Sequence, residues 1–417
     1  ALTCFKKSLQ IAPDFNNAKH GMAFLYQKEG KSFEAVPILK KLLKENAKDY
    51  ITLNNLGVCY QLQNDYDKSI EYFQMAIDIK PDLYESCFNI GVSNHHSWRF
   101  EKAIENYMQA IEIAPDRYEA LHNLGSSYYK SRKYDKALEY YKQISQEEEK
   151  SEVLFNIGCI YFKLKKFKEA INYFEKTIKL LPSSSEALNI MGIIYLKLDN
   201  KEAALKVLEK ASEINPNNNK IWNNLGSIYY HNNNFEKAIE SFNNALSINE
   251  TYEQRFNLGL VYLKQKDFPK ALECFKKSAE RNDEHYPSWL NIGYIFQNSN
   301  KNPNAIQFYK SAIGLNSARP EAWFNLGACY FKMKDFPKAN ECFERASEAS
   351  RKLKYRLALK LIKRNVGNYF QEEKKIDPKI PKVTMEIIKS LSKRHDSTRF
   401  ASMYTYEEPD EVNEEES

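Results

Sequence analysis

The stretch "WNNLGSIYYHNNNFEKAIESF", residues 222–242, places an asparagine, a glycine, two tyrosines and a lysine at positions that recur along the chain. Its glycine belongs to a column of ten whose successive members are 33 to 36 residues apart. They are Gly21, Gly57, Gly91, Gly125, Gly158, Gly192, Gly226, Gly259, Gly293 and Gly327. Because the whole chain has only 13 glycines, this spacing makes the stretch one unit of a repeated array.

Other residue types keep a fixed distance from these glycines. In most units an aromatic residue follows the glycine by three positions, an alanine by twelve, and a second aromatic by sixteen, as in Tyr229, Ala238 and Phe242. Apolar residues spaced by three and four share one face of a helix. Each unit is therefore predicted to form two short amphipathic helices, whose glycine permits an approach that a β-carbon would block. Neither helix can bury its apolar face alone, so neighbouring units must stack.

These columns resemble the tetratricopeptide repeat, a 34-residue helix-turn-helix with the pattern W-x2-L-G-x2-Y, A-x3-F and P. The resemblance implies an all-α, right-handed superhelical solenoid of about ten helix pairs over residues 1–350. Residues 1–15 match only a partial repeat, so we expect the natural N-terminus to lie upstream. We expect a basic capping helix and extension over 351–395, and an acidic disordered tail over 396–417.

Composition narrows the class of protein. No run of about 18 apolar residues is present among the 417, so no membrane span is predicted. The seven cysteines form no CxxC pair and are interpreted as small core residues of a protein in a reducing compartment. We therefore expect a cytoplasmic protein, with cytoskeletal and ciliary structures as further locations that the resemblance suggests.

Signals of catalysis are weak. The seven histidines include no HExxH pair, and no cysteine spacing is typical of zinc. Gly30-Lys31-Ser32 ends like a phosphate-binding loop, but Leu25 stands where that loop needs its first glycine. We expect no enzyme activity, no metal and no cofactor.

A column of asparagines stands two positions before the glycines, more than about 100° around the helix from the apolar stripe. An asparagine amide both donates and accepts, so a ladder of them can hold the backbone of an extended peptide. The arrangement is similar to the superhelix of O-GlcNAc transferase, without its catalytic domain. The alternative to peptide binding is that asparagine is simply common at this position in tetratricopeptide repeats, where water solvates it at the helix surface. Lys19 and Ile190 interrupt the column, whose predicted peptide-binding members are Asn55, Asn89, Asn123, Asn156, Asn224, Asn257, Asn291 and Asn325.

A second column lies five positions after the glycines, seven from the asparagines and nearly in line with them. Its lysines favour an acidic ligand through long-range attraction, and a solvated helix face is the alternative. Glutamates six positions before the glycines make the predicted groove mixed in charge, and the second asparagine of a chaperone-binding clamp is absent. The predicted electrostatic residues are Lys130, Lys163, Lys197, Lys264 and Lys332.

The sequence thus predicts a scaffold that holds a protein or peptide partner, acidic in character, within a multiprotein complex and without direct nucleic acid binding. One alternative is a structural subunit of a ciliary, axonemal or cell-cycle assembly. Another is the recognition part of an enzyme whose catalytic domain lies elsewhere. The imperfect units near Gly192 and Gly293 are interpreted as flexible joints or as points where a partner enters. A further hypothesis is that the acidic tail folds back on the basic cap or reaches the lysine column and competes with an acidic ligand, and a solvated, disordered tail is the alternative.

Overall fold

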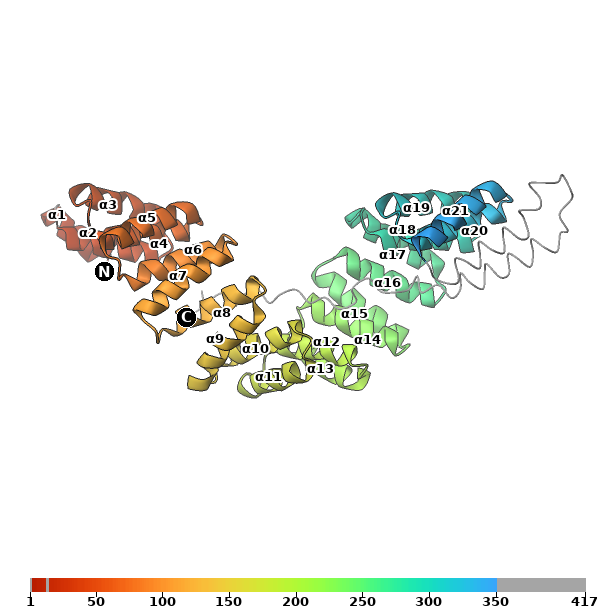
Figure 1. The fold of residues 1–417 in the computed structure, drawn as a ribbon, viewed down its shortest axis with the longest axis horizontal. Helices are drawn as coiled ribbons and strands as arrows, with labels where there is room; N and C mark the ends of the chain where they lie inside the picture. The colour runs from red at the N-terminus through yellow and green to blue at the C-terminus, as the bar shows by residue number, and fades with distance from the viewer. Residues whose placement is uncertain (1, 13–14, 351–417) are drawn as a thin grey trace. The chain divides into compact units, whose positions relative to one another are not determined.

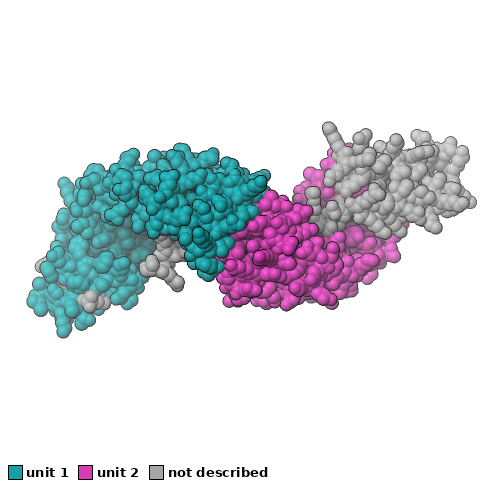
Figure 2. Space-filling view, turned by 90° about the horizontal axis from the view of Figure 1, so that it is seen from below, with its two compact units in different colours: residues 1–183 teal, residues 184–417 magenta. Residues whose placement is uncertain are grey.

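The computed structural model describes residues 2–12 and 15–350, and its regular elements there are all α-helices (Figure 1). This confirms the all-α prediction. The predicted capping segment 351–395 and acidic tail 396–417 lie outside the described residues. Figure 2 colours two compact units, residues 1–183 and 184–417, and each is described by itself.

Unit 1 opens with a single helix, after which the helices come in pairs, one pair to each repeat. The helices are α1 (Leu2–Ile11), α2 (Asn16–Lys28), α3 (Ser32–Glu45), α4 (Tyr50–Leu62), α5 (Tyr66–Ile79), α6 (Tyr84–His96), α7 (Phe100–Ile113), α8 (Tyr118–Lys130), α9 (Tyr134–Glu147), α10 (Ser151–Lys163) and α11 (Phe167–Leu180).

Unit 2 contains five further pairs, in which a first helix of 13 residues is followed by a second helix of 14. The helices are α12 (Ser185–Lys197), α13 (Lys201–Ile214), α14 (Asn219–His231), α15 (Phe235–Ile248), α16 (Tyr252–Lys264), α17 (Phe268–Arg281), α18 (Tyr286–Asn298), α19 (Asn302–Leu315), α20 (Pro320–Lys332) and α21 (Phe336–Ala349).

Packing follows the same order inside each unit. A first helix contacts the second helix of its own repeat, and that second helix contacts the first helix of the next repeat, as in the series α4, α5 and α6. First helices of neighbouring repeats also touch directly, for example α4 with α6 and α14 with α16. The first helices therefore line up beside one another within a unit, and their side chains form a shared surface.

The repeated glycines mark the closest contact between the two helices of a pair. From Gly57 to Gly327, a β-carbon added at the column glycine would lie 2.5–3.1 Å from the side chain sixteen residues later. Phe242 occupies this place beside Gly226, and Leu208 does so beside Gly192. Gly21 is the exception, because its near neighbour is Phe5 of the preceding helix. The predicted role of the glycines is confirmed, and the contacting group is the large residue of the second helix.

The turn between the two helices of a pair repeats one backbone conformation. Nine non-glycine residues, each seven positions after a column glycine, have φ between 57° and 64°. At one of them, the amide of Lys165 donates to the carbonyl of Phe162, and the next amide, of Lys166, donates to that of Tyr161. This left-handed helix end satisfies carbonyls that the helix leaves without partners.

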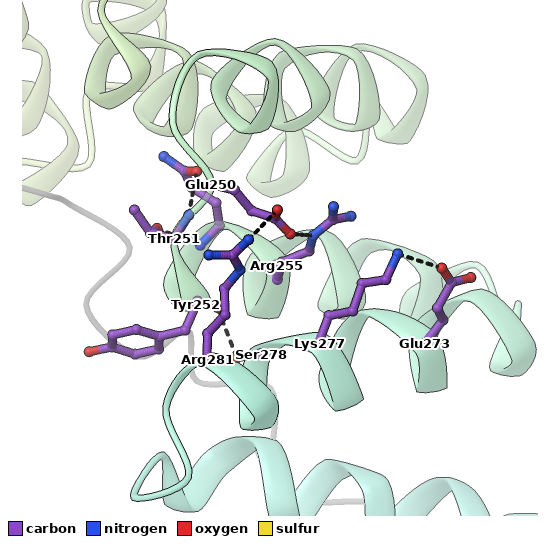
Figure 3. Close-up of polar contacts among 9 residues, drawn as sticks. Glu250, Thr251, Tyr252, Arg255, Glu273, Lys277, Ser278 and Arg281 are labelled. Atoms are coloured by element: carbon purple, nitrogen blue, oxygen red, sulfur yellow. Dashed lines mark hydrogen bonds and ion pairs between the residues drawn. The ribbon is translucent and has the colours of Figure 1, made fainter.

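Where a repeat has 33 residues, ion pairs support the shorter connection to the next repeat. Glu250 lies between α15 and α16, and its carboxylate accepts from Arg255 and Arg281 at 2.5 Å each (Figure 3). Thr251 and Gln254 form a capping box at the start of α16. The arginines come from α16 and α17, so this cluster connects the turn to both helices of the following repeat.

Replacing Gly226 by alanine should destabilise the protein by about 1–3 kcal/mol, because the methyl group would enter the Phe242 ring. Alanine is otherwise the better helix former by about 1 kcal/mol. Gly314→Ala in α19 is the matched control, since an added β-carbon there meets no atom within 4 Å. Urea unfolding should show a loss for the first variant and a gain for the second. Equal effects would contradict the close-contact role.

Candidate functional site

The predicted asparagines lie on the first helices of the repeats, in one column that we call the asparagine column. Their environment differs between the units. In unit 1 the members are half-buried, and in unit 2 they are buried, with exposed fractions of 0% for Asn224, Asn257 and Asn291 and 3% for Asn325. The half-buried members are Asn55, Asn89, Asn123 and Asn156. Their role in holding a peptide stays a prediction.

In unit 1 the column includes a histidine contact between repeats. The amide nitrogen of Asn156 lies 3.2 Å from Nε2 of His122 in the preceding repeat. The same nitrogen of His122 lies 3.0 Å from a carboxylate oxygen of Glu152. The amide of Asn156 therefore contributes to packing between α8 and α10 as well as to the column.

In unit 2 the amide groups form bonds that the sequence did not predict. Nδ2 of Asn224 donates to Oδ1 of Asn189 at 2.8 Å, and Nδ2 of Asn257 donates to Oδ1 of Asn223 at 3.2 Å. Both acceptors stand three positions before a glycine, one position from the column itself. That neighbouring position also carries Asn54, whose Oδ1 accepts from Ser86 at 2.9 Å. The asparagines at this position, three residues before the glycine, recur in the sequence and could have predicted these bonds between repeats.

These bonds use only the donor side of each amide. Nδ2 of Asn291 donates to the carbonyl of Pro287 at 2.8 Å, so three consecutive repeats commit their NH2 groups within the protein. The Oδ1 atoms of Asn224, Asn257 and Asn291 are buried and have no hydrogen-bond partner. A buried carbonyl without a donor costs about 1–3 kcal/mol. The three oxygens are therefore acceptors without a donor, enclosed among the first helices of unit 2.

The two interruptions of the column are buried rather than solvated. Lys19 pairs with Glu45 at 2.9 Å, and Ile190 is 3% exposed. Ile190 lies in α12, the first helix of unit 2, next to Asn189, which provides the amide contact to α14. The column of unit 2 is thus one residue out of register in its first repeat.

The lysine column consists of the predicted residues at the ends of the first helices. Lys130 and Lys163 in unit 1 are half-buried, while Lys197 and Lys264 in unit 2 are exposed. Nζ of Lys332 donates to Oδ1 of Asn300 in the turn of the preceding repeat. Their role toward a ligand stays a prediction.

A buried histidine lies at the start of α18. Nδ1 of His285 is 2.7 Å from Oγ of Ser288, which donates onward to Ser278, and Ser278 donates to the carbonyl of Tyr252. This direction of donation requires His285 to donate from Nδ1. Its Nε2 is buried without a partner and the ring packs against Phe256 at 4.9 Å. Burial, with a smaller contribution from Arg319 against the opposing Glu253, lowers the pKa of His285 to about 4.

The cysteines support the structural interpretation. All seven are free, and only Cys4 is exposed. Burial raises the pKa of the Cys274 thiol to about 11, and those of Cys329 and Cys342 to about 12. Such thiols stay protonated at neutral pH and are poor nucleophiles.

Comparison with models of known protein families identifies the family to which the chain belongs. Profiles described as tetratricopeptide repeat match residues 50–83, 118–150, 151–184, 185–218, 220–252, 253–285, 286–319 and 320–351, and one described as TPR repeat matches 99–131. The matches cover more than half of the chain. The chain belongs to the tetratricopeptide repeat family. The finer likeness to the O-GlcNAc transferase superhelix gains no support from these matches.

Solved TPR structures resemble parts of the chain. One described as "YrrB: a TPR protein with an unusual peptide-binding site" is 21% identical, covering 43% of this chain and 92% of that one, with a TM-score of 0.38. MamA is 23% identical over 38% and 94%, with a TM-score of 0.37. A tetratricopeptide repeat protein from Parabacteroides merdae ATCC 43184 is 19% identical over 56% and 93%, with a TM-score of 0.46. Comparison with curated protein sequences gives no match.

Metal sites, membrane-spanning helices and catalytic domains were each looked for in the described residues and in the matched sequence. Within residues 2–12 and 15–350, no group of three or more His, Cys, Asp and Glu side chains is arranged to hold a metal ion. In the same described part, no helix has the length and apolar character needed to cross a membrane. The matched sequence consists of repeats, and no catalytic domain is evident in it.

The free energy of unfolding should fall as pH is lowered from 6.5 toward 4, because unfolded His285 takes up a proton that the folded ring excludes. The loss attributable to this residue is roughly 3 kcal/mol at most. His285→Gln should remove most of it. The measurement is urea unfolding of both proteins across this pH range, with the difference between them plotted against pH. Parallel curves would show that His285 titrates normally.

Thiol labelling of the native protein should modify one cysteine rapidly, because only Cys4 is exposed among the seven. Labelling in denaturant should modify all seven. Cys4→Ser should abolish the rapid native phase and leave the slow phase unchanged. Rapid modification of a second thiol would show that a repeat opens readily, and peptide mapping would identify it.

Proposed function

We propose that this TPR protein is a protein-binding scaffold that holds an extended segment of a partner along the asparagine column. The observation that carries the proposal is the row of three buried, unpartnered carbonyl oxygens on Asn224, Asn257 and Asn291. They stand on α14, α16 and α18, one in each of three consecutive repeats. The oxygens are enclosed, so the side chains around them must move before a chain laid along these first helices meets one acceptor per repeat.

Backbone N–H groups are the donors that fit this row best. An extended chain presents them repeatedly and independently of its side chains, so three repeats can hold it without reading its sequence. The NH2 groups of the asparagines are already bonded inside the protein. The proposed contact is therefore one-sided, with the scaffold accepting and the ligand donating. This differs from the two-sided amide contact that the sequence suggested.

The lysine column adds a preference for acidic ligands. Lys264 follows Asn257 by seven residues on α16, and Lys332 follows Asn325 by seven on α20, so each pair lies on nearly the same helix face. The two residues of a pair are about 10 Å apart along the helix, so a ligand carboxylate about two helical turns from the backbone contact would lie beside the ammonium group. The seven free cysteines fit a reducing compartment such as the cytoplasm, which we propose as the location.

The test is capture of partners from native extract, followed by affinity measurements on a synthetic peptide of the segment that cross-links to the first helices. Changing Asn224, Asn257 and Asn291 together to alanine removes three acceptors worth about 1 kcal/mol each. The peptide should bind roughly 100-fold more weakly. Circular dichroism should show that the repeats remain helical.

The matched control is Asn189→Ala with Asn223→Ala. It breaks the same hydrogen bonds between repeats from the other end while leaving the three acceptors in place. Binding should survive in this control. If the acceptor variant keeps every partner, the function lies away from the asparagine column, as expected for a structural subunit of a larger assembly.

A further inference from the structure

We propose that the turns between paired helices in unit 1 form a second interaction surface, which binds an acidic segment of another protein. The partner segment also supplies an apolar side chain that covers Trp98. The surface belongs to three consecutive repeats, those of Gly91, Gly125 and Gly158. It does not depend on the asparagine column, which the proposed function uses.

Two neighbouring turns concentrate positive charge. Each has three basic residues and one acidic residue among the five positions that lie seven to eleven after the column glycine. No other repeat has more than two basic residues there. The six basic residues are all exposed, and we call them the basic edge: Arg132, Lys133, Lys136, Lys165, Lys166 and Lys168.

Acidic residues in and beside these turns are fewer. Asp135 and Glu169 stand in the first turns of α9 and α11. Glu101 reaches from the preceding turn to Lys133, at 3.6 Å. Even when these three acids are counted against the six basic residues, three positive charges remain, so the edge attracts a negatively charged partner.

The turns along this edge already bind carboxylates between repeats. Arg99 pairs with Asp67 at 2.7 Å, and Lys133 pairs with Glu101 at 3.6 Å. In both pairs a basic residue eight positions after its glycine meets an acid of the preceding turn. Lys166 is the next residue in this series, and it forms no ion pair within residues 2–12 and 15–350. A carboxylate from a partner can extend the series there, which is why we infer an acidic protein segment rather than RNA.

The basic residues of this series stand where other repeats have a helix cap. Asp65 and Asn234 occupy the same position, and each side chain accepts from a backbone amide of its second helix. Arg99, Lys133 and Lys166 form no such bond. A positive charge also opposes the dipole at the start of a helix. Three consecutive repeats thus lack a stabilising cap, and binding of a negatively charged partner gives a reason for the basic residues.

Trp98 lies in the turn that precedes the basic edge, and it is 76% exposed. Its φ is 59°, a conformation that bulky residues rarely adopt, and the other eight non-glycine residues in this conformation are polar or charged. The same turn contains Glu101, which pairs with Lys133, so this turn adjoins the basic edge. Tryptophan is enriched among the residues that anchor protein interfaces. We therefore assign the partner an apolar side chain beside its carboxylates.

The probe is the synthetic peptide Phe-Ser-Gly-Glu-Ser-Gly-Glu-Ser-Gly-Glu, acetylated at its N-terminus and labelled with a dye at its C-terminus. An extended chain advances about 10 Å in three residues, close to the roughly 8–10 Å between packed helices, so successive glutamates can reach successive turns. Fluorescence anisotropy at low salt should show saturable binding to the full chain. A probe with glutamines should bind at least tenfold more weakly, and salt should weaken binding of the glutamate probe. Absence of saturable binding, or equal binding of the glutamine probe, would overturn the proposal.

Two variants of the full chain with the same change of charge locate the site. The variant of the basic edge is Lys165→Gln, Lys166→Asn and Lys168→Gln. The control in unit 2 removes three exposed charges from turns, including the basic residue before α19: Lys266→Gln, Lys301→Asn and Lys334→Gln. The edge variant should bind the probe at least tenfold more weakly, and the control should stay within twofold of the unaltered chain. Equal loss in both would show unspecific attraction and overturn the proposed site.

Trp98→Asn tests the apolar part of the surface. Asparagine occupies the equivalent position as Asn64, Asn233 and Asn300, so the variant should unfold at no lower urea concentration than the unaltered chain. It should bind the probe at least fivefold more weakly, because the phenylalanine of the probe loses the exposed ring. Unchanged affinity would overturn the proposed partner.

A dye-labelled, single-stranded oligouridylate of ten nucleotides tests the other class of partner. Its binding should not differ between the edge variant and the unit 2 control. If it binds the full chain more tightly than the peptide and depends on the basic edge, the surface is a nucleic acid site and the proposal is wrong.

The three asparagines of the proposed function separate the two surfaces. Changing Asn224, Asn257 and Asn291 together to alanine should leave binding of the probe unchanged. Loss of binding in this variant would place the probe on the asparagine column and overturn the second surface, while the proposed function would stand.

Discussion

The contact between the glycine of a first helix and the large side chain of its second helix is the constraint on which the other features depend. A β-carbon at Gly226 would lie within 2.8 Å of the Phe242 ring, so the two helices approach as closely as they do only because that atom is absent. The contact recurs within the repeats from Gly57 onward. It fixes the face that each first helix buries, and thereby the faces that remain for other uses.

The buried face of each first helix also determines which groups surround the asparagines. A position two residues before the glycine lies beside the neighbouring repeat, and the Nδ2 groups of Asn224 and Asn257 bond across that contact. The geometry satisfies the donors of these amides and leaves their carbonyl oxygens without partners. One side of each amide thus helps to hold the array together, while the other side is the feature from which we infer binding.

The two units use the same columns differently. In unit 1 the histidine at position 122 meets Asn156, and the asparagines are half-buried. In unit 2 the corresponding contact is between two asparagines, once from Asn224 to Asn189 and once from Asn257 to Asn223, and the asparagines of the column are buried. The division between the units precedes α12, whose Ile190 stands in the asparagine column while Asn189 beside it supplies the amide contact. A shift of one residue in α12 preserves the bond between repeats and leaves its own repeat without an acceptor in the row.

By itself, the sequence determined the repeat length, the helix pairs, the glycine contact and the structural role of the cysteines, because each depends on periodic spacing of side chains along a helix. It also placed the asparagine and lysine columns on the first helices. Only the tertiary structure decided which amides bond across repeats, how deeply Asn224, Asn257 and Asn291 are buried, and that Nε2 of His285 has no donor. These properties depend on residues 30 or more positions apart, or on neighbours from several helices, and a single helical period carries no information about such contacts.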